Sequence, residues 1–174
     1  STTGPVSLIA TNDGARRHEL PGHDDGTNSI AWRPSEQTSE VRSQESESRR
    51  VDLISDLSPL TSGLLLATGG QDGAVKFWDA AAGQHVVTVS LGTAWVEHLA
   101  WRSAGGSPAS GTQAGGSPAL LLAAGEQDLT ALRPDGSVVH TFKPAPKTIS
   151  ALAWQPPGGC VAAAYFGGVC LWDA

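Results

Sequence analysis

A pattern of three strands occurs three times in these 174 residues and constrains the fold more than any other feature of the chain. The first strand of each copy contains an aliphatic residue, an alanine and a tryptophan in succession, and an apolar hairpin follows it. Repeated units of this kind are the sequence signature of repeat architectures, so the pattern predicts a series of short antiparallel sheets. The three tripeptides are Ile30-Ala31-Trp32, Leu99-Ala100-Trp101 and Leu152-Ala153-Trp154.

The hairpin of the first copy, LLLATGGQDGAVKFWD at 64–79, shows its parts most clearly. The apolar run at 64–67 is typical of a strand that is covered on both faces. Glycines and Asp72 then provide turn chemistry, because glycine adopts positive φ and an Asp side chain bonds its own turn backbone. The β-branched and aromatic residues at 75–78 predict a second strand.

An apolar strand, a turn that carries Asp and a strand that ends in Trp-Asp resemble the WD-repeat β-propeller family. Trp78-Asp79 and Trp172-Asp173 end two of the hairpins, and Gly22-His23 precedes the first strand of the first copy, as in that family. The resemblance implies an all-β propeller fragment of antiparallel four-stranded blades, about three blades of a larger ring. The sequence contains no methionine, so we expect a processed or partial chain, with a longer parent chain or partners completing the ring.

The order of strands and turns predicts four parts. These are the end of a preceding blade at 1–20, a blade at 21–90, a second blade at 91–142 and an incomplete last blade at 143–174.

Two insertions interrupt the expected blades at the same place, between the first and second strands. Residues 35–60 begin with a stretch dense in Ser, Glu, Gln and Arg, which cannot bury enough apolar surface to offset the entropy of ordering, so we expect disorder there. The Gly/Ser-rich composition of 103–118 is typical of a flexible linker.

The resemblance also implies a structural relay of hydrogen bonds in the first copy. In the resembled family a His, a Ser or Thr, an Asp and a Trp often tie one blade together, and His23, Thr68, Asp72 and Trp78 match these positions. The residue types suit the purpose, because a carboxylate needs donors, a His can bond partners at both ring nitrogens, and an indole only donates.

A catalytic set of the Ser/His/Asp kind is the alternative explanation of the same residues. Thr68 would then lie inside a packed blade, and the sequence offers no nucleophile elbow and no oxyanion hole. We therefore expect no catalytic residue and a protein that is not an enzyme.

Composition and spacing argue against several other functions. The remaining histidines lie on different predicted strands without zinc-ligand spacing, and no phosphate-binding glycine loop occurs, so we expect no metal and no cofactor. The formal net charge of −6 argues against a nucleic-acid partner. No apolar run approaches the roughly 20 residues of a membrane span. Two cysteines and no leader sequence favour an intracellular, cytoplasmic location.

Recognition of other proteins is the function that remains. Propellers of the resembled family usually bind partners through the loops that lead into the first strand of each blade. Trp95 stands at such a loop, where its ring either anchors a partner or packs under the loop. Asn28, Glu97 and Lys147 are candidates for polar contacts nearby.

The sequence thus predicts a non-catalytic scaffold that binds partner proteins through its loops and edges, within a multiprotein complex. Two alternatives stay open. One is a structural subunit of a large assembly. The other is a propeller enzyme or small-molecule binder that uses the central channel, where the first strands offer mainly Glu97 and His98.

Overall fold

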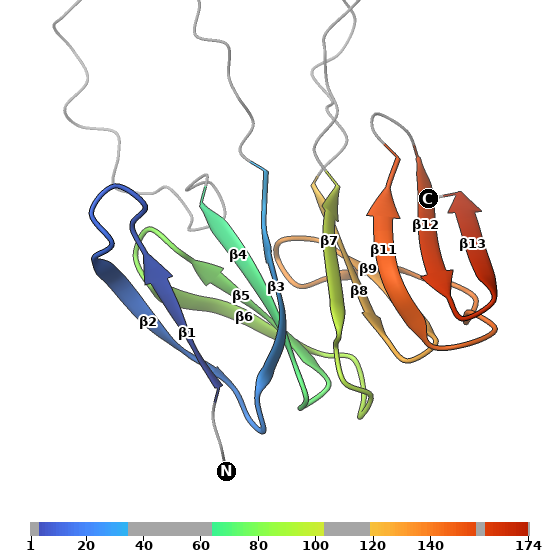
Figure 1. The fold of residues 1–174 in the computed structure, drawn as a ribbon, viewed down its shortest axis with the longest axis horizontal. Coiled ribbons are helices and arrows are strands. Elements are labelled where there is room, and N and C mark those ends of the chain that lie inside the picture. Colours follow the sequence, from blue (N-terminus) through green and yellow to red (C-terminus); the bar gives the residue numbers. More distant parts are fainter. Residues whose placement is uncertain (1–3, 35–63, 103–118, 156–158, 174) are drawn as a thin grey trace, which may run out of the picture.

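The structure, a computed structural model, describes residues 4–34, 64–102, 119–155 and 159–173. In these residues it contains thirteen strands in four antiparallel sheets and no helix, so the predicted all-β fold of antiparallel blades is confirmed. The sheets follow one another from left to right in Figure 1. Both predicted insertions, 35–60 and 103–118, lie outside the described residues.

Within each sheet, strands that are neighbours in the chain are also neighbours in space. We number the sheets as blades in chain order. Blade 1 holds β1 (Gly4–Ile9) and β2 (Arg16–His23); blade 2 holds β3 (Thr27–Trp32), β4 (Leu65–Gly70), β5 (Ala74–Asp79) and β6 (Gln84–Ser90); blade 3 holds β7 (His98–Arg102), β8 (Leu120–Gly125), β9 (Asp128–Leu132) and β10 (Val138–Thr141); blade 4 holds β11 (Ile149–Trp154), β12 (Cys160–Tyr165) and β13 (Gly168–Asp173).

The structure differs from the expected boundaries at the end of blade 1. Gly22-His23 was expected to open the second blade, but both residues belong to β2. The reason is pairing, because the ladder between β1 and β2 continues until Gly4 faces His23. A positive φ of 75° at Gly22, and a register shift between Gly4 and Val6, bend the strand there.

The central strands form because their residues are covered on both faces. All six residues of β4 are buried, which matches the continuous apolar run in its sequence. The tight turn after β4 depends on Gly73, which has a φ of 69°. A Cβ atom at Gly73 would lie only 2.2 Å from the backbone oxygen of Gly92. A larger residue at that position would therefore push away the loop that leads into blade 3.

The apolar core lies between blades. Leu8 and Leu20 of blade 1 pack against Leu66 and Trp78 of blade 2. A second cluster joins blades 2 and 3, with Phe77 and Trp101 in edge-to-face contact at 6.0 Å between ring centroids. A third cluster joins blades 3 and 4 in the same way. Each blade is therefore held chiefly by apolar contact with its neighbours along the chain.

Hydrogen bonds also join the first strands of neighbouring blades. We call these strands, β3, β7 and β11, the inner strands. The Nε1–H of Trp101 on β7 donates to the backbone oxygen of Ala31 on β3, at 3.1 Å. One blade further along, the Nε1–H of Trp154 on β11 donates to the oxygen of Ala100 on β7, also at 3.1 Å. The repeated Ala-Trp pair thus supplies the acceptor for one neighbour and the donor for the other.

A second bond runs in the opposite direction across each of these interfaces. The hydroxyl of Ser29 on β3 donates to the oxygen of Val96, at 3.1 Å. The Nε2 atom of His98, which occupies the place of Ser29 on β7, lies 3.0 Å from the oxygen of Ile149 and must donate to it, since a carbonyl only accepts. We call these two kinds of bond the inner-strand bridges.

Candidate functional site

Four side chains of blades 1 and 2 are joined in one chain of hydrogen bonds. The Trp78 Nε1 atom lies 2.9 Å from Thr68 Oγ1, and Thr68 Oγ1 lies 2.8 Å from His23 Nε2. The other ring nitrogen, His23 Nδ1, lies 2.9 Å from Asp72 Oδ1. These are the four residues that the resemblance assigned to a structural relay, and the structure brings them together.

The hydrogen-bonding capacity of each group fixes the direction of the relay. An indole only donates, so Thr68 Oγ1 accepts from Trp78. The Thr68 hydroxyl then donates to His23 Nε2, and His23 Nδ1–H donates to the Asp72 carboxylate. Asp72 also accepts from the backbone N–H of Ala74, at 3.1 Å, so the relay ends on the turn between β4 and β5. Each donor of the relay therefore meets an acceptor, and each acceptor meets a donor.

Burial keeps the histidine of this relay neutral. His23 is fully buried. Burial lowers the pKa of His23 below its usual 6.5, outweighing the hydrogen bond and the charge of Asp72, which raise it. The contact between His23 and Asp72 is therefore a hydrogen bond from a neutral ring to a carboxylate at neutral pH, although the two groups lie at ion-pair distance.

Local sequence makes room for the relay. Gly70 at the end of β4 lies against the His23 ring, and a Cβ atom there would come within 2.3 Å of its Cγ. On β5, Lys76 Nζ donates to the backbone oxygen of Gly22 at 2.6 Å, which holds the bend just before His23. The relay therefore ties β2 of blade 1 to both central strands of blade 2.

The geometry of this site does not suit nucleophilic catalysis. The Thr68 side chain is fully buried, so no substrate reaches its hydroxyl. Asp72 alone among the four is partly open to solvent. Among the described residues, no group of three or more His, Cys, Asp or Glu side chains could hold a metal ion.

Trp95 lies in the loop that leads from blade 2 into blade 3, and this loop is held at both ends. The N–H of Leu91 bonds the oxygen of Gly73, and the N–H of Val96 bonds the oxygen of Gly70, both at 2.9 Å. The N–H of Glu97 bonds the oxygen of Ala124, at 3.0 Å. Val96 is buried in the core between the two blades, whereas the neighbouring Trp95 is 51% exposed.

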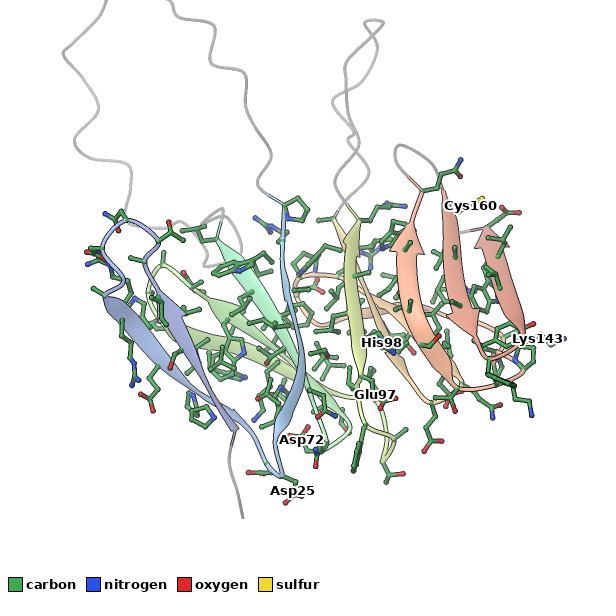
Figure 2. All side chains as sticks on the ribbon, in the orientation of Figure 1. Asp25, Asp72, Glu97, His98, Lys143 and Cys160 are labelled. Carbon is green, nitrogen blue, oxygen red and sulfur yellow. The ribbon has the colours of Figure 1, made fainter. Side chains whose placement is uncertain are left out.

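The other candidate binding residues lie along the same edge of the sheets, which we call the loop edge and define by loops 24–26, 91–97 and 142–148. Asn28 is exposed and its Oδ1 accepts from Gln71 at 3.3 Å. Glu97 is partly buried and lies toward this edge in Figure 2, as do Asp25 and Asp72. Lys147 is exposed in the loop before β11, with no hydrogen bond or ion pair to the other three within the described ranges.

An open hollow of about 370 Å³ lies along the inner strands. Its lining includes Glu97 and His98 but excludes Trp95, Asn28 and Lys147. Three of its polar groups already donate to backbone oxygens, namely Ser29 Oγ, His98 Nε2 and Ser150 Oγ. The candidate residues therefore do not converge on one pocket.

Sequence reasoning missed the inner-strand bridges. The recurrence of Ala-Trp was visible, and it was the signal that could have pointed to a repeated contact between strands. The partner atoms could not be named, because each bond joins residues 51 to 70 positions apart in the chain.

The fold is that of a WD-repeat-type β-propeller fragment with antiparallel blades. The family model described as "WD domain, G-beta repeat" matches residues 44–79, which include β4, the Asp72 turn and β5.

The structure also contains, in the part of the chain that it describes, no helix long and apolar enough to cross a membrane.

Two curated relatives match about half of the chain. Gem-associated protein 5 from Mus musculus is 37% identical over 92 residues, which cover 49% of this chain and 6% of that protein. Gem-associated protein 5 from Homo sapiens is 35% identical over 92 residues, with the same two shares. The chain thus spans about 6% of the length of these relatives.

Solved structures show the same fold at lower identity. The computationally designed Ika4 protein matches with a TM-score of 0.64 and 13% identity, covering 98% of this chain and 79% of that one. A chain of the Mitotic Checkpoint Complex matches with a TM-score of 0.65 and 20% identity, covering 98% of this chain and 44% of that one.

Thr68→Val tests whether the relay stabilises the fold. The substitution keeps the side-chain shape but leaves the buried Trp78 N–H and His23 Nε2 without partners, so we expect a loss of about 2–4 kcal/mol in the free energy of unfolding. Thr141→Val on the exposed strand β10 is the matched control and should change it by less than about 0.5 kcal/mol. Denaturant titration measures both values. Equal effects of the two substitutions would contradict a stabilising relay.

The lowered pKa of His23 predicts a pH dependence of stability. The unfolded histidine takes up a proton near pH 6.5 but the folded one resists it, so the unfolded state binds more protons below that pH. The stability that depends on a neutral His23 is fully present above pH 6.5 and is lost as the pH falls below that value. Chemical denaturation between about pH 7.5 and 5.5 should therefore show a steeper loss in the wild type than in His23→Asn. The same slope in both proteins would mean that His23 titrates normally in the fold.

Proposed function

We propose that this part of the chain is a non-catalytic scaffold that binds partner proteins through the loop edge, with Trp95 as the anchor. The observation that carries the proposal is the half-exposed Trp95 ring on a loop fixed by backbone bonds to both neighbouring blades. A large aromatic side chain on a rigid loop loses little conformational freedom when a partner covers it.

The polar surroundings of Trp95 favour a partner with basic groups. Glu97 follows it in the chain, and Asp25 and Asp72 lie toward the same edge in Figure 2. The formal net charge of −6 also favours a partner with basic groups. Asn28 and Lys147 lie on the first strand of blade 2 and before that of blade 4, so a partner that spans blades 2 to 4 would reach both.

The curated relatives support a place in a multiprotein complex, since their name describes association with Gem. A structural subunit of a large assembly is the closest alternative, and it would use the same edges and loops. Both cysteines are free thiols, which fits an intracellular, reducing environment such as the cytoplasm.

A small-molecule site or an active site in the central channel is the second alternative. The hollow beside Glu97 and His98 favours it. The bonds of Ser29, His98 and Ser150 to backbone oxygens count against it, because these groups already hold strands together. The scaffold therefore remains the function that the geometry supports best.

Trp95→Ala should weaken partner binding and leave stability unchanged. We expect at least a tenfold loss of affinity, about 1.4 kcal/mol, because an anchor ring would be removed. The free energy of unfolding should stay within about 0.5 kcal/mol, since half of the side chain is exposed. Quantitative affinity purification, followed by calorimetry with the partner found, measures the first effect.

Val138→Ala on β10 is the matched control, because Val138 is also about half exposed but lies on the outermost strand of blade 3. Partners should be retained by this variant. If Trp95→Ala retains the same partners with unchanged affinity, Trp95 is not the anchor.

A further inference from the structure

The open hollow along the inner strands is built from one level of three consecutive blades. Each of the strands β3, β7 and β11, or the residue just before it, contributes side chains that lie two to four positions ahead of the tryptophan of the Ala-Trp pair. Blade 1 and strands β12 and β13 contribute none. The volume of about 370 Å³ falls in the range of ligand-binding pockets, about 300–1,000 Å³.

Two serines of this lining have already used their protons. The Ser29 hydroxyl donates to the backbone oxygen of Val96 at 3.1 Å, and the Ser150 hydroxyl donates to that of Ala164 at 3.2 Å. A hydroxyl has one proton and two lone pairs, so each serine can only accept from a ligand. These bonds count against an active site, but they leave the acceptor capacity of both groups intact.

The other two polar side chains of the hollow are also acceptors. The Nε2–H of His98 donates to the backbone oxygen of Ile149 at 3.0 Å, so the Nδ1 atom of the neutral ring has only a lone pair to offer. Glu97 adds a partly buried carboxylate, which forms no ion pair with any other described residue. The polar side chains of the hollow therefore present acceptors only, and one of them is negatively charged.

Apolar side chains complete the lining. Leu99 and Leu152 both belong to it, and both also pack against the core clusters between blades. Ala151 occupies on β11 the position that Ser29 has on β3 and His98 has on β7, so a methyl group stands where the other strands carry a polar side chain. A lining of this kind suits a ligand with an aliphatic stem and a charged head.

We propose that the hollow binds the guanidinium group of an arginine side chain that a partner protein inserts from the loop edge, with Glu97 as the counterion. This inference rests on the proposed function, because the partner is the protein held at the loop edge. A guanidinium has five N–H donors and no acceptor, which complements polar side chains that only accept. Its planar fork reaches acceptors on several strands, whereas the ammonium of a lysine is a compact point charge.

Glu97 connects the hollow to the loop edge. It is the last residue of loop 91–97 and also lines the hollow. The half-exposed Trp95 lies two residues earlier on the same loop. Figure 2 shows Glu97 nearer to the loop edge than His98, which lies further along β7. An arginine that enters beside Trp95 therefore meets the carboxylate of Glu97 first and the ring of His98 next.

N-acetyl-arginine amide tests the chemistry of the hollow without a partner protein. Added to the isotope-labelled chain and followed by nuclear magnetic resonance, it should shift the backbone amide signals of Glu97 and His98. Glu97→Gln should weaken its binding at least about tenfold, because the charged acceptor is lost. Glu126→Gln is the matched control, since Glu126 is exposed between β8 and β9 and does not line the hollow.

N-acetyl-citrulline amide, a neutral analogue of nearly the same shape, should leave the signals of Glu97 and His98 unchanged. No shift with the arginine probe, equal shifts with the citrulline probe, or equal binding of the arginine probe to Glu97→Gln and Glu126→Gln would each overturn the proposal.

Binding of the partner protein separates this inference from the proposed function. We expect Glu97→Gln to weaken binding of the same partner that Trp95→Ala loses, and Glu126→Gln to retain it. If Trp95→Ala loses the partner and Glu97→Gln binds it with unchanged affinity, the scaffold stands and the arginine site is wrong. If the arginine probe binds at Glu97 but no protein depends on Trp95 or Glu97, the scaffold and the partner's arginine are both wrong, and the hollow takes a free guanidinium compound.

Discussion

Contact between the faces of consecutive blades is the constraint on which this structure depends. Each of the three apolar clusters contains side chains from two neighbouring blades. A single three- or four-stranded sheet of this composition would expose one apolar face to water. Folding of each blade is therefore coupled to the presence of the next, as in other repeat proteins, and the chain order of the blades sets their order in space.

Polar groups give this apolar stacking a defined register. The inner-strand bridges fix the offset between neighbouring inner strands, because an indole N–H and a carbonyl oxygen must meet at about 3 Å. The relay from Trp78 to Asp72 acts at the interface of blades 1 and 2, where His23 reaches from β2 into blade 2. A buried His is tolerated there because both of its ring nitrogens are bonded, which removes the penalty of an unpaired polar group.

The sequence predicted the elements of this fold better than the contacts between them. The hairpin at 64–79 and the Ala-Trp strands were visible because their residue types and turn chemistry are local. The relay followed from a family resemblance rather than from spacing. The bridges of Trp101, Trp154, Ser29 and His98 were not predicted, since they depend on how separate blades pack. For Trp95 the sequence left two alternatives, and the structure shows a half-exposed ring on a fixed loop.

The most direct test of the account is hydrogen exchange at the tryptophan indoles, followed by nuclear magnetic resonance. The chain has six tryptophans, each with its own indole N–H signal. The bonds of Trp101 and Trp154 to the carbonyls of the preceding blade predict slow exchange at both, relative to the exposed Trp95. Exchange at Trp101 and Trp154 as fast as at Trp95 would contradict the claim that inner-strand bridges hold the blades in register.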